Sequence, residues 1–161
     1  METPGHTTDH CSFVVTHVTP ESNKSPFLFC GDTLFIGGVG KLLDGPQLSN
    51  DLFESVKKLM ALPNETLVFC GHEYSVKNLE FALKMEPEND TIASKLDLMR
   101  NMRQNGQFTV GSPLMDERLY NPFVRCFGAD LATKEYFAEI TGESMDTTAR
   151  FVFQKIRMLK D

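Results

Sequence analysis

The stretch TPGHTTDH, residues 3–10, is the part of the chain around which the predicted fold is arranged. It is polar and turn-rich, and it leads directly into CSFVVTH at residues 11–17, a β-branched and aromatic run typical of a strand. His6 follows a Pro-Gly turn, so its imidazole can project from a loop. Rigid scaffolds present binding and catalytic groups on such loops. His6 is therefore a candidate functional residue.

Two later segments repeat this arrangement, GDTLF at residues 31–35 and GHEY at residues 71–74. In each, an apolar run ends in a glycine that is followed by a metal-capable side chain, Asp32 or His72. A catalytic zinc takes three protein ligands and keeps one position for water, and a carboxylate can bridge two ions. We predict that His6, Asp32 and His72 converge on metal, with no catalytic residue beyond these ligands.

The alternatives at these positions stay open, because Gly-Asp and Gly-His turns are common and each alone can be an ordinary loop. His10 either supports the site by hydrogen bonding or only begins the strand, and His17 is expected to end that strand in solvent. Cys30 and Cys70 end apolar runs, where cysteine is usually a small buried hydrophobe. The alternative for both is a thiolate that touches the metal.

Composition limits the classes of partner. The net charge of −6 argues against nucleic acid as the main partner, since phosphate binding needs a basic face. No apolar run approaches the roughly 20 residues that span a bilayer, and no secretory signal pattern is visible. The four cysteines form no CxxC pair, which favours reduced thiols and a cytoplasmic setting.

The chain order predicts an α/β layer followed by helices. Strands are expected at residues 27–30 and 66–70, with a helix capped by Ser49 between them and another over residues 75–85. After Pro87 we expect a helix from the N-cap Asp90 to residue 105, a helix over residues 129–140, and a last one capped by Asp146. The predicted domains are residues 1–87 and 88–161. Three or four strands leave the sheet short, so either strands are missing or another chain supplies them.

TPGHT, GDTLF and GHEY, in this order, resemble the motifs of the metallo-β-lactamase superfamily. With FIGGVGK at residues 35–41, the run from GHEY to residue 89 and YNPF at 120–123, the chain is similar to the hydroxyacylglutathione hydrolase (glyoxalase II) family. The resemblance implies an αββα sandwich with a C-terminal helical domain. It also implies hydrolysis of glutathione thioesters, such as lactoylglutathione, to glutathione and a 2-hydroxy acid at a dinuclear zinc site, with iron or manganese as alternatives.

The resemblance also implies roles for single residues. His6 would ligate one metal, Asp32 would bridge both and His72 would ligate the other. Lys41 and Tyr74 match family positions that contact glutathione, with a solvated loop lysine and a packing residue as the alternatives. The basic residues that the family carries near its C-terminus are matched by Lys155 and Arg157.

The departures from the family pattern are as informative. The HxHxDH motif that supplies most metal ligands is not in the sequence, Leu43 stands where an aromatic is expected, and Asp9 replaces a glycine. We therefore expect the chain to be the C-terminal part of a hydrolase, with impaired activity on its own. It would be a monomer or be completed by another chain. Its location would be mitochondrial if a targeting segment is missing. The alternatives are a non-catalytic glutathione- or protein-binding remnant and a persulfide dioxygenase-like enzyme.

Overall fold

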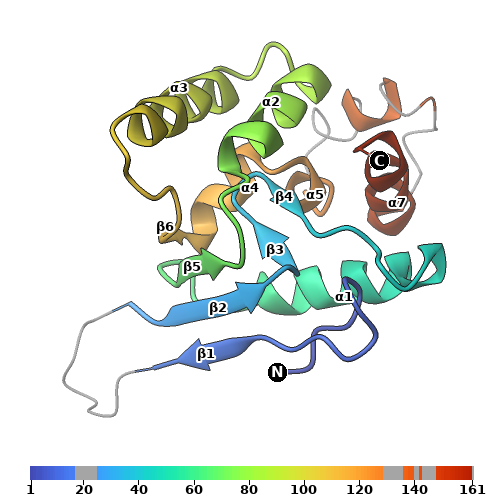
Figure 1. Cartoon of the computed structure of the whole chain (residues 1–161). Helices are drawn as coiled ribbons and strands as arrows, with labels where there is room; N and C mark the ends of the chain where they lie inside the picture. The colour runs from blue at the N-terminus through green and yellow to red at the C-terminus, as the bar shows by residue number, and fades with distance from the viewer. Residues whose placement is uncertain (17–24, 129–135, 140–141, 143–147, 161) are drawn as a thin grey trace.

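The computed structural model describes residues 1–16, 25–128, 136–139, 142 and 148–160 (Figure 1). A four-stranded sheet in the order β1-β2-β5-β6 lies beside a small two-stranded ribbon, β3-β4. The strands in chain order are β1 (Phe13–Val15), β2 (Phe27–Gly31), β3 (Leu34–Phe35), β4 (Gly38–Val39), β5 (Leu67–Cys70) and β6 (Ser112–Pro113).

The helices follow the α/β order that the sequence predicts. They are η1 (Pro46–Leu48), α1 (Ser49–Leu59), α2 (Ser75–Met85), α3 (Asp90–Gln104), η2 (Leu114–Asp116), α4 (Glu117–Tyr120), α5 (Pro122–Arg125) and α7 (Ala149–Lys160). Residues 136–139 are also helical. The rest of the helix predicted over 129–140, the cap predicted at Asp146, and His17 lie outside the described residues. In the part of the chain described, no helix has the length and apolarity to cross a bilayer.

The pairing of β2 with β5 places the functional loops. These two strands are parallel, with Phe29 opposite Phe69, and α1 forms the crossover between them. Their carboxyl ends therefore lie at the same edge of the sheet, where ligands bind in open α/β folds. Gly71 donates its backbone N–H to the Gly31 carbonyl at 2.8 Å, which joins the two strand ends directly.

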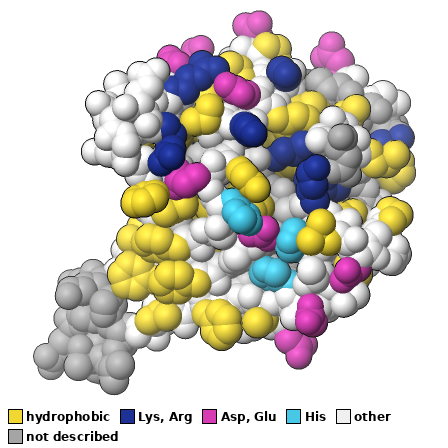
Figure 2. Space-filling view, viewed as in Figure 1, with side chains coloured by type: hydrophobic (Ala, Val, Ile, Leu, Met, Phe, Trp, Pro, Cys, Tyr) yellow, Lys and Arg dark blue, Asp and Glu magenta, His cyan; other side chains and the backbone are white. Residues whose placement is uncertain are grey.

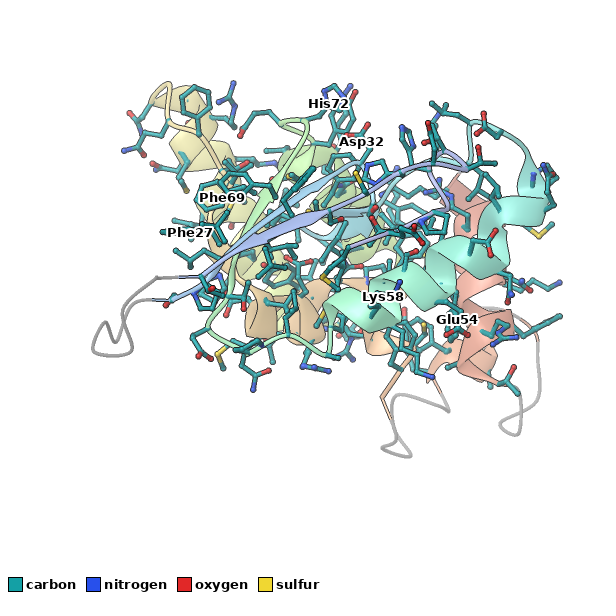
Figure 3. All side chains as sticks on the ribbon, turned by 90° about the horizontal axis from the view of Figure 1, so that it is seen from below. Phe27, Asp32, Glu54, Lys58, Phe69 and His72 are labelled. Atoms are coloured by element: carbon teal, nitrogen blue, oxygen red, sulfur yellow. The ribbon has the colours of Figure 1, made fainter. Side chains whose placement is uncertain are left out.

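The sheet has one buried face and one exposed face. Leu28, Cys30 and Val68 are fully buried on the face covered by the helices. On the opposite face lie the side chains that we call the aromatic face: Phe13, Val15, Phe27, Phe29 and Phe69. Phe13 and Phe29 are 63% and 46% exposed, and Phe29 stacks on Phe69 at 5.4 Å between ring centroids. Hydrophobic surface accordingly collects beside the histidines in Figure 2, and Figure 3 shows Phe27 and Phe69 side by side.

The C-terminal helices are packed onto the sheet layer by aromatic side chains. Phe153 of α7 lies edge-on to Phe53 of α1 and to Phe123 of α5, with ring centroids 5.5 and 5.3 Å apart. All three side chains are at most 5% exposed. Because each ring belongs to a different helix, this cluster fixes α7 against α1 and α5 and brings its polar side over the functional edge.

Two predicted helix starts are wrong. Ser49 is the first residue of α1 and does not cap it, because the chain enters α1 directly from the turn η1. The Ser49 hydroxyl accepts no capping hydrogen bond. Asn89, not Asp90, caps α3: its side chain accepts hydrogen bonds from the N–H groups of Thr91 and Ile92. Adjacent residues that both favour the N-cap position cannot be ranked from sequence alone.

Candidate metal centre and substrate cavity

His6 is held in one orientation by the backbone. Its Nδ1 lies 2.8 Å from the Lys41 carbonyl oxygen. A carbonyl only accepts, so Nδ1 carries the proton and donates it, which leaves the Nε2 lone pair free in the neutral ring. Gly5 permits this loop to lie against α1, because a Cβ there would be 2.4 Å from the Leu52 Cα. The turn before His6 thus needs glycine for a steric reason.

Asp32 lies between the two other predicted ligands. Its Oδ2 is 3.4 Å from His6 Nε2 and 3.3 Å from His72 Nε2. A Cβ at Gly71 would lie 2.4 Å from Asp32 Oδ1, so the glycine before His72 is what lets the carboxylate fit. Figure 3 shows Asp32 and His72 together at one end of the strands, and in Figure 2 the histidines gather around an acidic side chain.

The donor chemistry suits zinc, but the ligand shell is partial. Ligand atoms around a tetrahedral zinc with bonds near 2.1 Å are separated by about 3.4 Å, close to the two distances at Asp32. However, no group of three or more His, Cys, Asp or Glu side chains among the described residues is arranged to hold an ion. Asp32 therefore forms two pairs, one with each imidazole. A pair supplies two ligands to an ion, whereas a catalytic zinc takes three from the protein.

His10 supports Asp32 from behind. The Asp32 backbone N–H donates to His10 Nε2 at 3.2 Å, so the ring proton is on Nδ1, which lies 2.9 Å from Thr33 Oγ1. Burial, and next the neighbouring His6, lower the pKa of His10. Of the two roles open to this residue in the sequence, the structure shows the hydrogen-bonding one.

The cysteines near the strand ends are structural thiols. Cys30 is buried and donates to the Leu34 carbonyl at 3.0 Å, and burial raises its pKa. Burial also raises the pKa of Cys70 to about 11, and its Sγ contacts the His72 carbonyl at 3.4 Å. Because both sulfurs are directed at backbone carbonyls, the geometry disfavours the thiolate alternative.

A cavity of about 680 Å³ opens over the centre, and basic side chains border it. His6, Asp32 and His72 line it together with Lys41, Lys77, Arg157 and Lys160, and its remaining lining residues are Phe35, Val39, Gly40, Leu43, Tyr74 and Asn78. Tyr74 stacks on His72 with ring centroids 4.9 Å apart. Asp32 is the one carboxylate among these lining residues. An acidic protein thus presents a local basic pocket that suits a small anion.

The predicted substrate-binding residues fall in two places. Lys41, Tyr74 and Arg157 line the cavity, whereas Lys155 lies with its Nζ 5.3 Å from the Phe151 ring centroid and is not among the lining residues. Lys160 and Lys77 line the cavity without having been predicted. The register of α7 contains the missing signal: Lys160 follows the buried Phe153 and Ile156 by seven and four residues, on the same helix face.

The sequence comparisons divide the chain into two family matches. Residues 1–72 match the metallo-beta-lactamase superfamily, and residues 73–161 match the hydroxyacylglutathione hydrolase C-terminus. The hydroxyacylglutathione hydrolase of Idiomarina loihiensis is 42% identical over the whole chain, and that of Rhodospirillum rubrum is 38% identical. The chain spans 58% and 57% of these two relatives.

A solved structure supports the fold alone. The crystal structure of a metallo-beta-lactamase from Staphylococcus aureus superposes on this chain with a TM-score of 0.51 and 18% sequence identity. The superposition covers 96% of this chain and 37% of the Staphylococcus aureus chain. This similarity agrees with the metallo-β-lactamase-like fold that the motifs predict.

Proposed function

The chain belongs to the hydroxyacylglutathione hydrolase family, and we propose that it supplies one part of a metal-dependent hydrolase of glutathione thioesters. The products would be glutathione and a 2-hydroxy acid, as with lactoylglutathione. The observation that carries the proposal is the position of Asp32 Oδ2, 3.3–3.4 Å from two imidazole nitrogens, at a cavity bordered by four basic side chains. A glutathione thioester, with two carboxylates and a net negative charge, suits that pocket.

The superfamily implies metal ions, and we propose zinc, with one ion beside His6, a second beside His72, and Asp32 between them. Iron and manganese are the alternatives. Metal ions held there would supply hydroxide near neutral pH, because coordination lowers the pKa of water to about 7. The Lys41 carbonyl keeps His6 Nε2 directed at Asp32, so this chain contributes orientation of the ligands.

The basic side chains would bind the glutathione carboxylates. Lys41 and Lys160 come from opposite halves of the chain and both border the cavity, so an extended tripeptide can span them. Tyr74 covers His72 on one side, where it can exclude water from the reacting carbonyl. These contacts hold the thioester beside the centre and leave its acyl group at Asp32.

Completion of the ligand shell requires groups beyond these three residues. We propose that a second β-layer, formed by residues outside this sequence in the same protein or in another chain, packs on the aromatic face and brings the missing ligands. Two features support this: among the described residues only pairs form at Asp32, one with each imidazole, and no group of three could hold an ion; and the aromatic face lies exposed on the sheet that carries β2 and β5. In this proposal, the chain alone is a monomer with a partial centre.

The test is a hydrolysis assay with lactoylglutathione and zinc. The chain alone is expected to hydrolyse the thioester slowly or not at all. Co-expression with the part of the Idiomarina loihiensis relative that the chain does not match is expected to give a complex that retains zinc and restores hydrolysis. Rapid hydrolysis by the chain alone, or a zinc-loaded complex without hydrolysis, would contradict the proposal.

A second candidate is a non-catalytic glutathione-binding protein, favoured by the partial ligand set. The two candidates differ in their response to metal. For the binding protein, glutathione raises the melting temperature and zinc does not. For the hydrolase, zinc protects as well, and protection is lost when His72 is replaced.

A further inference from the structure

Glu117 is a fully buried carboxyl group that the proposed chemistry does not use. Glu117 is the first residue of α4, and it has no solvent-exposed surface. Its Oε2 accepts hydrogen bonds from the Gly37 backbone N–H at 3.0 Å and from Asn121 Nδ2 at 2.8 Å, and its Oε1 accepts one from the Tyr120 hydroxyl at 2.9 Å. A buried carboxyl is costly unless it is hydrogen-bonded. All these partners are donors, so the site is built around this group.

These hydrogen bonds fix the turn between β3 and β4. Gly37 adopts a φ of 71°, which favours glycine, and its N–H is directed at Glu117. Asn121 Nδ2 also donates to the Gly38 carbonyl at 3.1 Å. Farther along, Arg157 donates to the Val39 and Gly40 carbonyls at 3.3 and 3.2 Å. The helical half of the chain therefore holds this glycine-rich segment at successive residues.

The same segment continues into the metal centre. A Cβ on Gly40 would lie 1.9 Å from the Asp32 carbonyl oxygen and 3.2 Å from His6 Nδ1, so the segment passes directly against both predicted ligands. Gly40 donates its N–H to the Thr33 carbonyl at 3.4 Å. The next carbonyl, that of Lys41, accepts the hydrogen bond from His6 Nδ1. A shift of the segment would therefore move the group that orients His6.

We propose that Glu117 is a positioning residue for the metal centre: it anchors the segment from Gly37 to Lys41, and the Lys41 carbonyl then holds His6 Nε2 toward Asp32. The importance of this orientation for metal binding rests on the proposed function. The contacts themselves do not, since each joins two groups of this chain. These contacts connect α4, in the C-terminal half of the chain, to the predicted metal ligand His6 in the N-terminal half.

The test uses the metal-free chain and follows the His6 ring by ¹⁵N NMR, with the signal assigned by its loss in His6→Gln. In the wild type we expect a proton on Nδ1 that exchanges slowly with water. In Glu117→Ala we expect exchange at least about fivefold faster, as for loss of one hydrogen bond, with part of the ring in the Nε2-protonated tautomer.

Two further variants separate positioning from general stability. Glu117→Gln is expected to keep the wild-type signal, because its oxygen can accept from Gly37 and Asn121 while its amide group faces the Tyr120 oxygen. Glu86→Ala is the matched control: Glu86 is also buried, 5% exposed, but is paired with Arg125 away from the centre. It is expected to lower stability and leave the His6 signal unchanged.

The proposal is overturned if Glu117→Ala folds and gives a His6 signal like that of Glu86→Ala. If Glu117→Ala does not fold, Glu117→Asp decides, because it retains the carboxylate but retracts it from Gly37. Its His6 exchange is expected to lie between those of wild type and a free imidazole, and a wild-type rate would refute the proposal. Absence of zinc retention or of thioester hydrolysis by the co-expressed complex would instead count against the proposed function and leave these results intact.

Discussion

At the scale of single residues, the centre depends on which nitrogen of each imidazole carries the proton. His6 donates from Nδ1 to a carbonyl and His10 accepts at Nε2 from a backbone N–H, so both rings have one defined neutral tautomer. His6 therefore presents a lone pair toward Asp32, while His10 supports the Asp32 backbone. Two histidines four positions apart in one motif thus perform different tasks.

Glu117 gives a residue-scale prediction for pH dependence. Burial raises the pKa of this carboxyl from 4.5 to about 7 in the folded protein. The folded state therefore keeps the proton to higher pH than the unfolded state does. The resulting stabilisation is complete below about pH 4.5 and is lost as pH rises to about 7, a change of about 3 kcal/mol.

This prediction is measured by urea unfolding of the wild type and Glu117→Gln between pH 4.5 and 7. The free energy of unfolding of the wild type, relative to the variant, should fall across the interval. Parallel curves for the two proteins would show that Glu117 does not titrate there.

The convergence of His6, Asp32 and His72 could be predicted from the sequence, whereas the groups that support them could not; their role as metal ligands stays a prediction. His6, Asp32 and His72 can be recognised because each follows a turn next to an apolar run, and parallel pairing of β2 with β5 brings the last two together. Glu117 could not be found in this way, because a glutamate in the run ERLY is typical of an exposed helix. Its burial depends on the turn at Gly37, eighty residues earlier.

At the scale of elements, α7 decides which basic side chains reach the cavity. Phe153 and Ile156 are buried, which directs Arg157 and Lys160 to the cavity side. Lys155 lies against Phe151 instead. The sequence predicted a basic C-terminal helix, but without its register the choice between Lys155 and Lys160 could not be made.

Replacement of Lys160 by Ala should weaken glutathione binding about three- to tenfold, because one charge-assisted contact is removed. Lys155→Ala is the matched control on the same helix and should bind like the wild type. Isothermal titration with glutathione measures both. Equal losses for the two variants would show that α7 contributes only diffuse charge.

The start of α3 gives a second element-scale prediction. Asn89 accepts hydrogen bonds from two backbone N–H groups, at 3.1 and 3.3 Å, so Asn89→Ala should lower the free energy of unfolding by about 1 kcal/mol. Asp90→Ala should cost less, since Asp90 lies in the first turn of α3 and its expected contribution is the interaction with the helix dipole. Chemical denaturation of the two variants measures both losses of unfolding free energy. A larger loss for Asp90→Ala than for Asn89→Ala would show that Asp90 is the N-cap residue.

At the scale of the whole molecule, a helix layer covers one side of the sheet and the aromatic face is exposed on the other. The sequence predicted three or four strands, and the described residues form a four-stranded sheet and a two-stranded ribbon; that strands are missing stays a prediction. The exposed face of the sheet could not be located from sequence, because β1 and β2 are apolar on both faces. The expected domain boundary near residue 88 stays a prediction.

Exposed aromatic side chains should give the monomeric chain a weak tendency to self-associate, which becomes detectable only at high protein concentration. Replacing Phe13 and Phe29 by Lys is expected to lower self-association at high protein concentration, with a loss of stability of about 1 kcal/mol because Phe29 stacks on Phe69. Leu98→Lys is the control, since Leu98 is 53% exposed on α3, away from this face. Sedimentation velocity should show an effect of the first pair only.

The central claim is that one carboxylate, that of Asp32, joins two imidazoles from separate loops into a common centre. Zinc titration of the ¹⁵N-labelled chain, followed through the histidine ring signals, tests it most directly. We predict that the His6 and His72 signals shift together on addition of zinc, that the His10 signals do not follow them, and that Asp32→Asn abolishes both shifts. Independent shifts of His6 and His72 that persist in Asp32→Asn would contradict the account.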